Sequence, residues 1–309
     1  MKNDETLKIE AMLSRQGINR YLIDEVKKFR EKYADTENRT LTAPAYIYYG
    51  RDVWEMAIAA VVCRENILLS GPKATGKNVL ADNLAYVFGR TSYNMSFHVN
   101  TDSASLIGTD TFADNQVMLR KGPVYLCASE GAFGIFDEIN MAKNDAVSVL
   151  HSSLDHRRVI DVPGYHKIEL NDATRFIGTM NYGYAGTKEL NEALVSRFLV
   201  VDMPAADEDT LRKILSDSFE SLTENALSQF SGLFLDLQLK ALNGEISTKP
   251  VDLRGLISAV RTIEIGLSPS LAVMMGLTNK CFDTFERDII NDVVMTRIPP
   301  NWSAEDVFG

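Results

Sequence analysis

A short glycine-containing segment with one lysine could hold the phosphates of a nucleotide. Residues 71–78 read GPKATGKN, and they follow an apolar run and precede a helix-like stretch. A strand, a GxxxxGK loop and a helix in this order form a P-loop, whose backbone N–H groups and helix dipole attract an anion. Lys77 is expected to reach the β- and γ-phosphates. The residues predicted to bind the nucleotide are Gly71, Pro72, Lys73, Ala74, Thr75, Gly76, Lys77, Asn78 and Val79.

Asn78 departs from the usual pattern of this loop. A serine or threonine hydroxyl normally binds Mg²⁺ at this position. An amide oxygen is also a hard ligand that Mg²⁺ accepts, but the asparagine side chain is one atom longer than serine. We therefore expect Asn78 to bind the metal with a shifted geometry or through a water. The same residue motivates an alternative, in which the chain binds nucleotide with little turnover.

Two acids and an asparagine follow the ends of two later apolar runs. Asp137 and Glu138 come directly after Gly134-Ile135-Phe136, and Asn181 comes after another apolar run. Asp137 is expected to hold Mg²⁺, directly or through water. Glu138 is expected to orient and deprotonate the attacking water, with help from Asn181. Because ligands bind at the carboxyl edge of a parallel sheet, these side chains are predicted to share one crevice with the P-loop.

The elements that must position these residues can be read from the same pattern. Five short apolar runs alternate with helical stretches: Asn66–Ser70, Tyr93–Val99, Phe133–Phe136, Arg175–Met180 and Phe198–Asp202. This alternation is typical of a parallel sheet flanked by helices. We predict an α/β nucleotide-binding core at 46–204, followed by a helical lid and C-terminal helices at 205–309. The helical segment at 1–45 has an apolar stripe, which favours packing on the core over recruitment of a partner.

The overall composition excludes several classes of protein. The 309 residues carry a net charge of −10, which disfavours the phosphate contacts of nucleic-acid binding. No apolar run approaches the roughly 20 residues that cross a bilayer, and the polar residues 1–5 do not resemble a signal peptide. Three scattered cysteines and four histidines show no zinc-site spacing. We therefore expect a cytoplasmic protein without a membrane or nucleic-acid partner.

Taken together, these motifs resemble the MoxR-type AAA+ ATPases. The resemblance is carried by the P-loop, by Asp137-Glu138, by Thr179-Met180-Asn181 and by Ala193–Phe198. It looks closest to the branch that includes the activators of Rubisco and of nitric-oxide reductase, and it is also similar to the AAA modules of midasin. The resemblance covers about residues 45–265. It implies an AAA+ P-loop core with a small helical lid domain, ATP and Mg²⁺ as ligands, and ATP hydrolysis.

The resemblance also implies roles for single residues. Asn181 matches sensor 1, Arg197 matches the arginine finger that reaches the ATP of a neighbouring subunit, and Arg254 matches sensor 2 in the lid. An arginine supplied in trans stabilises charge on the transferring phosphoryl group. Arg175 and Arg158 are the alternatives to Arg197. A site completed between subunits implies a homo-oligomeric ring, with a hexamer as the expected size.

Two further segments are similar to elements of the same proteins. Thr111–Pro123 resembles the insert in helix 2, and Asp155–Leu170, with a Pro163-Gly164 turn, predicts a β-hairpin. In the family such elements face the pore or a partner. The resemblance implies a motor that remodels or activates a client protein or metalloenzyme, with a separate von Willebrand factor A domain companion. A nucleotide-gated binding module and a nucleic-acid-linked AAA+ motor remain as alternatives.

Overall fold

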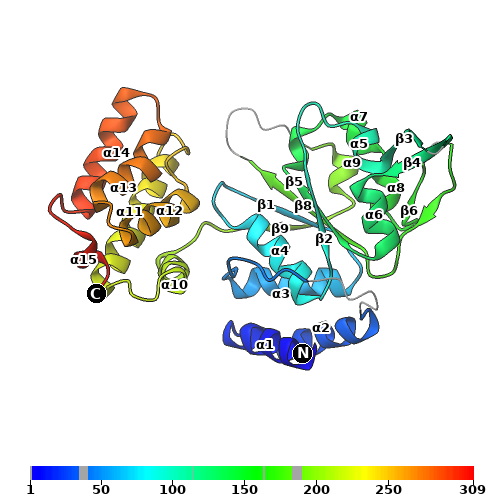
Figure 1. Ribbon diagram of the computed structural model, residues 1–309, viewed down its shortest axis with the longest axis horizontal. Coiled ribbons are helices and arrows are strands. Elements are labelled where there is room, and N and C mark those ends of the chain that lie inside the picture. Colours follow the sequence, from blue (N-terminus) through cyan, green and yellow to red (C-terminus); the bar gives the residue numbers. More distant parts are fainter. Residues whose placement is uncertain (1, 35–40, 114, 163, 183–189) are drawn as a thin grey trace. The chain divides into compact units, whose positions relative to one another are not determined.

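The computed structural model describes residues 2–34, 41–113, 115–162, 164–182 and 190–309 (Figure 1). The chain divides into two compact units. The first, an α/β unit, comprises Met1–Pro72 and Gly76–Met203, and the second, a helical unit, comprises Lys73–Thr75 and Pro204–Gly309. No helix in the described ranges is both long enough and apolar enough to span a bilayer.

A parallel sheet of five strands forms the centre of the α/β unit. The strands are β1 (Ile67–Gly71), β2 (Ser92–Ser96), β5 (Phe133–Asp137), β8 (Arg175–Asn181) and β9 (Leu199–Asp202). Their order is β2-β5-β8-β1-β9, and every neighbouring pair is parallel. The predicted α/β class and all five predicted strands are therefore confirmed, with ends shifted by a few residues.

Helices cover both faces of this sheet, which explains why its central strands read as continuous apolar runs. Alternate residues of β1 enter different cores, because side chains alternate across a strand. Ile67 and Leu69 pack with α3 (Arg51–Val62) and α4 (Lys77–Val87) on one face. Leu68 packs on the other face in a second core, which also contains residues of α5 (Ser103–Ile107), α6 (Pro123–Glu130), α7 (Asn144–Ser148), α8 (His151–Leu154) and α9 (Glu192–Val195).

The N-terminal helices α1 (Lys2–Arg15) and α2 (Arg20–Lys32) belong to the first of these cores. The ring of Phe29 meets that of Phe88 edge to face, with centroids 4.9 Å apart. Arg30 Nη1 donates to the carbonyls of Tyr86 and Val87 at 2.9 and 3.0 Å. A cation at the C-terminus of α4 stabilises the helix carbonyls and the helix dipole. These helices therefore pack on the chain's own core.

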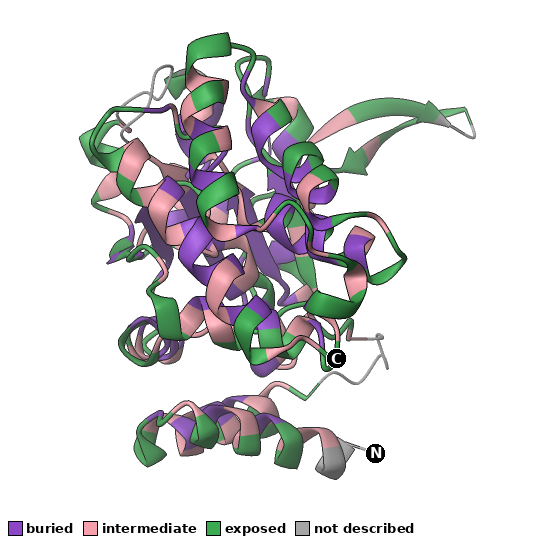
Figure 2. Ribbon diagram, turned by 90° about the vertical axis from the view of Figure 1, so that its left-hand side faces the viewer, coloured by how far each residue is buried: buried purple, intermediate pink, exposed green. Residues whose placement is uncertain are grey.

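Two antiparallel ribbons extend the α/β unit. β3 (Gly108–Ala113) pairs with β4 (Gln116–Lys121), so the predicted 111–123 insert is a ribbon that leads into α6. Its exposed residues stand out from the body of the unit (Figure 2). β6 (Val159–Ile160) pairs with β7 (Ile168–Glu169), which confirms the predicted hairpin with shorter strands. Pro163 of the predicted turn lies outside the described residues.

The helical unit confirms the predicted helical C-terminal region. Its helices are α10 (Glu208–Ser218), α11 (Glu224–Leu242), α12 (Leu253–Glu264), α13 (Pro269–Gly276), α14 (Thr284–Arg297) and α15 (Ala304–Val307). One apolar core joins them, with Phe230 and Phe234 of α11 fully buried. At the crossing of α12 and α13, a Cβ on Gly255 would lie 2.3 Å from the carbonyl oxygen of Gly276. A larger residue at Gly255 would therefore push the two helices apart.

Candidate nucleotide-binding site

The predicted P-loop connects the last residue of β1 to the first residue of α4. Ala74 and Gly76 have φ angles of 65° and 81°, in the left-handed region that favours glycine. A Cβ on Gly76 would also lie 3.1 Å from Cδ2 of the Tyr48 ring. The loop therefore depends on glycine at position 76 for its backbone conformation and for its contact with Tyr48.

Lys77, the first residue of α4, has its ammonium group inside the loop. The residue is only 7% exposed, and its Nζ donates to the carbonyls of Gly71 at 2.9 Å and Pro72 at 2.6 Å. Burial lowers the pKa of Lys77 to about 8, while the charges of Asp137 and Glu138 oppose this effect. A buried ammonium beside a helix N-terminus suits a polyphosphate, which would compensate its charge.

The predicted acids are held together by a threonine. Asp137 ends β5, and its Oδ1 accepts a hydrogen bond from the Thr179 hydroxyl at 2.8 Å. The same hydroxyl oxygen accepts from the backbone N–H of Glu138 at 3.1 Å. Asn181 Nδ2 donates to Glu138 Oε1 at 3.0 Å. The structure thus brings Asp137, Glu138 and Asn181 into one network.

Strand register places this network beside the P-loop. Gly71 at the end of β1 pairs with Asn181 at the end of β8, so the loop and the network share the carboxyl edge of the sheet. Glu138 has a φ of 54°, which is uncommon for a residue other than glycine. Such backbone outliers concentrate at functional sites, where surrounding contacts hold them in place.

The donor set is suited to Mg²⁺ that arrives with a nucleotide. Asp137 and Asn78 offer a carboxylate and an amide oxygen, and Asn78 is the second residue of α4. The parts of the chain that the structure describes contain no group of three or more His, Cys, Asp or Glu residues placed to hold a metal. Mg²⁺ at phosphate sites uses one or two protein ligands together with substrate phosphates and waters. The residues present therefore fit a nucleotide-bound Mg²⁺ better than a permanent metal cage.

Three residues near this edge had no role predicted from the sequence. Thr179 lies two positions before Asn181. Because side chains alternate across a strand, the sequence could have placed both on the same face of β8. Asp82 of α4 is exposed, but desolvation of its carboxyl raises its pKa, and the charge of Asp137 adds to this shift. Burial raises the pKa of Tyr48 to about 12. Neither Asp82 nor Tyr48 belongs to a recognisable motif.

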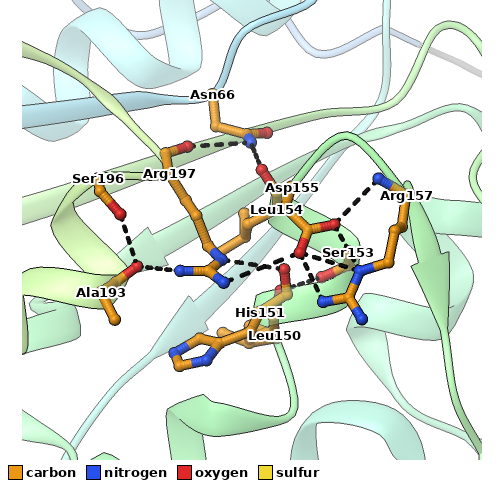
Figure 3. A network of polar contacts seen from close by, with 10 residues as sticks. All are labelled: Asn66, Leu150, His151, Ser153, Leu154, Asp155, Arg157, Ala193, Ser196 and Arg197. Carbon is orange, nitrogen blue, oxygen red and sulfur yellow. Dashed lines mark hydrogen bonds and ion pairs between the residues drawn. The ribbon is translucent and has the colours of Figure 1, made fainter.

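Arg197 lies at the opposite edge of the sheet from the P-loop, where the parallel strands begin. It precedes β9, whose first residue, Leu199, pairs with Ile67 at the start of β1. Four residue steps of β1 separate this edge from Gly71, about 13 Å at roughly 3.3 Å per residue. Arg197 Nε donates to the His151 carbonyl at 3.2 Å, and Nη1 donates to the carbonyl of Ala193 (Figure 3). Arg197 is therefore not next to Lys77 of its own chain.

The two alternatives to Arg197 have other roles. Arg175 is 1% exposed, and its guanidinium donates to the carbonyls of Val61, Asp172 and Thr174. Arg158 donates through Nη2 to the carbonyls of Asn171 and Thr174. Both side chains satisfy backbone groups of their own unit, so Arg175 in particular is wrong as a candidate for reaching another subunit.

Arg254, the predicted sensor 2, belongs to the helical unit. It is exposed at the second position of α12, and its backbone N–H donates to the N-cap residue Asp252 at 3.1 Å. Lys280 pairs with the other carboxylate oxygen of Asp252. The role of Arg254 toward a nucleotide stays a prediction.

Comparisons with known proteins agree with this architecture. A family model described as "AAA domain (dynein-related subfamily)" matches residues 66–198. The chain is 30% identical over 245 residues to YojN, an uncharacterized protein of Bacillus subtilis, with 78% of this chain and 80% of YojN covered. It is 32% identical over 249 residues to an uncharacterized protein of Staphylococcus epidermidis, with 78% and 94% covered.

Among solved structures, a candidate ATPase of Cytophaga hutchinsonii superimposes with a TM-score of 0.47 and 14% identity, covering 96% of this chain and 88% of that one. The sequence matches carry the assignment. The chain belongs to the AAA family and contains a domain of its dynein-related subfamily.

Proposed function

We propose that the protein is a MoxR-type AAA+ ATPase, which hydrolyses ATP with Mg²⁺ at sites shared between neighbouring copies of the chain. The observation that supports this proposal most is the pairing of Glu138 with Asn181 at the edge that also contains the buried Lys77. A site that only bound nucleotide would need Lys77, but it would not need a carboxylate held in a fixed orientation.

In this mechanism the residues around Glu138 prepare a water for attack. Because Asn181 binds one carboxylate oxygen of Glu138, the other oxygen is oriented to accept a proton from that water. The water oxygen bonds to the γ-phosphorus, the bond from this phosphorus to the bridging oxygen breaks, and ADP leaves. The Thr179 hydroxyl binds both the Asp137 carboxylate and the Glu138 N–H, and so fixes their positions relative to each other. Asp137 and Asn78 would hold Mg²⁺, which would supply positive charge next to the nucleotide phosphates.

The position of Arg197 supports a site that two chains complete. Arg197 and Lys77 lie at opposite edges of one sheet, so a single chain cannot bring both to one nucleotide. A head-to-tail arrangement of identical chains would place Arg197 of one chain near the P-loop of the next, and such an interface closes into a ring. We propose a hexameric ring, the size that the MoxR resemblance implies.

The same resemblance supports the proposed biological role. Hydrolysis would move the helical unit of each chain, and the ring would transmit this motion to a client protein or metalloenzyme. We propose a separate von Willebrand factor A domain protein as companion and the cytoplasm as location. The net charge of −10 supports a protein client over a nucleic acid.

A comparison of the wild type with Glu138→Gln tests the proposed activity. We expect Mg²⁺-dependent ATP hydrolysis by the wild type and a loss of about 10²–10⁴-fold in Glu138→Gln, with ATP binding retained, because the amide cannot accept the proton. Wild-type protein that binds ATP tightly without turnover would support the nucleotide-gated binding module instead. Unchanged turnover in Glu138→Gln would remove Glu138 from its proposed role.

A further inference from the structure

Two arginines share one carboxylate at the edge of the sheet that contains Arg197 (Figure 3). Arg157 holds Asp155 at several points: Nη2 lies 2.6 Å from Oδ2, Nε lies 3.0 Å from Oδ1, and the backbone N–H of Arg157 also donates to Oδ1 at 3.0 Å. Arg197 Nη2 lies 3.8 Å from the same Oδ2. Asp155 thus makes hydrogen bonds with Arg157 and only a longer charge contact with Arg197.

A buried asparagine makes hydrogen bonds to the backbone on both sides of this cluster. Asn66, 4% exposed, donates from Nδ2 to the carbonyl of Leu154 at 2.8 Å and to that of Arg197 at 3.4 Å. Leu154 is the last residue of α8 and directly precedes Asp155. One side chain therefore connects the segment that carries Asp155 to the segment that carries Arg197. This connection holds the backbone of the two segments close together.

Asp155 lies next to Arg197, which is proposed to bind a phosphate of the ATP on the neighbouring chain. The carboxylate could therefore compete with that phosphate for Arg197. A guanidinium has five N–H donors, and those on Nε and Nη1 of Arg197 serve the carbonyls of His151 and Ala193. At 3.8 Å, Asp155 orients Nη2 through charge without taking a hydrogen bond from it. If Asp155 moved closer, it would form a bidentate pair with Arg197, the strong form of the arginine–carboxylate interaction. The Nη2 donors would then be occupied by Asp155.

We propose that Arg157 and Asp155 are positioning residues for Arg197, an inference that rests on the proposed trans role of Arg197. Arg157 holds Asp155 back, so that the carboxylate aligns Arg197 without closing on it. The side chain of Arg157 is 54% exposed, against 23% for Arg197 and 14% for Asp155, so Arg157 contacts the carboxylate from the solvent side. The two arginines and one carboxylate keep a net charge of +1, which favours the approach of a polyphosphate.

The test is a double-mutant cycle on the assembled oligomer, with kcat and KM for ATP measured separately. Arg157→Gln should lower kcat about tenfold, because Asp155 is then free to close on Arg197. KM should change little, since ATP binds on the neighbouring chain. Adding Asp155→Asn to Arg157→Gln should bring kcat back to about threefold below the wild type, because the amide cannot form that ion pair; the remaining loss reflects the missing charge that aligns Arg197.

Matched variants separate this effect from general damage. Arg64→Gln removes an exposed arginine that pairs with Asp172 in the same unit, and it should leave kcat unchanged. Arg157→Lys should give an intermediate kcat, because an ammonium does not reproduce the fork of contacts. Thermal unfolding of each variant reports whether the fold is intact.

Three outcomes would overturn the inference. Wild-type kcat in Arg157→Gln, while Arg197→Ala is inactive, would mean that Arg157 has no part in positioning Arg197. A double variant as slow as Arg157→Gln alone would mean that Asp155 is not the cause of the loss. Wild-type kcat in Arg197→Ala would instead overturn the trans role of Arg197, on which the inference rests.

Discussion

The side-chain amide of Asn181 donates a hydrogen bond to Oε1 of Glu138 at 3.0 Å, across the edge where two parallel strands end. This bond connects the residue proposed to activate water with a neutral residue of the adjacent strand. Because an amide can donate and accept, it orients the carboxylate without adding charge.

Replacement of Asn181 should affect turnover more than ATP binding. Asn181→Ala removes the donor and should lower kcat about tenfold to 100-fold, since the carboxylate loses its fixed orientation. Asn181→Asp should be at least as slow, because a second carboxylate cannot donate a hydrogen bond to Glu138 and would repel it. Steady-state kinetics, together with binding of a non-hydrolysable ATP analogue, measure both effects. If Asn181→Ala raises KM and leaves kcat unchanged, its role is in binding.

Thr179 should be as important as the acids that it connects. Thr179→Val keeps the shape of the side chain but removes the hydroxyl that binds Asp137 and the Glu138 N–H. We predict a kcat lower by about tenfold or more and a weaker affinity for Mg²⁺, since both acids lose a hydrogen-bond partner. Thr179→Ser retains the hydroxyl and should keep most of the activity. Equal activity of the valine and serine variants would show that the hydroxyl does not matter.

Much of this arrangement could be predicted from sequence because it depends on local pattern. β1 and β5 are buried on both faces and so read as apolar runs, and the P-loop and Asp137-Glu138 follow directly from them. The roles of Arg175 and Tyr48 could not be predicted, because they depend on contacts with residues far along the chain. Arg175 differs from an exposed arginine only through its burial and its bond to the Val61 carbonyl.

The Arg157–Asp155–Arg197 cluster could not be predicted from the sequence for the same reason. Its members come from two segments that are brought together by strand pairing and by the side chain of Asn66. Register determines which edge of the sheet each residue occupies. Local sequence pattern predicts that a strand exists, but it contains no information on its neighbours in the sheet.

The pH dependence of nucleotide binding should reveal the buried Lys77. Its pKa is lowered by burial to about 8 from 10.5, so its ammonium loses the proton as pH rises through about 8. ATP affinity should fall above that pH, by up to about tenfold per pH unit, because the phosphates need the charged form. Calorimetric titration between about pH 7 and 9.5 measures this. Lys77→Arg keeps its charge over the range and should bind independently of pH; the same independence in the wild type would contradict the assignment.

The same pKa shift affects stability with the opposite sign. In the folded protein without nucleotide, Lys77 releases its proton near pH 8, whereas in the unfolded chain it does so near 10.5. Between these values the unfolded chain binds more protons, so the contribution of Lys77 to the free energy of unfolding increases with pH. Chemical denaturation of the wild type and Lys77→Met across this window isolates the contribution. A difference between the two proteins that does not change with pH would contradict it.

Arg175 should contribute to stability and not to catalysis. Arg175→Met leaves the carbonyls of Val61, Asp172 and Thr174 without their donor, and such unsatisfied buried groups cost about 1–3 kcal/mol each. We predict a lower free energy of unfolding by at least about 2 kcal/mol and wild-type kcat per folded protein. Urea denaturation and active-site titration measure the two quantities. A stable but inactive Arg175→Met variant would reinstate Arg175 as a candidate for the trans-acting residue.

In the proposed ring, one chain supplies Lys77 and another supplies Arg197 to the same ATP. The most direct test mixes Lys77→Ala, which cannot bind ATP, with Arg197→Ala, which lacks the trans-acting group. Each variant alone should be inactive, while a 1:1 mixture should recover activity at about a quarter of its interfaces, where an intact P-loop meets an intact Arg197. Exchange of subunits in the mixture is verified by labelling one variant. A mixture that stays inactive despite exchange, or Arg197→Ala that is active alone, would contradict the account.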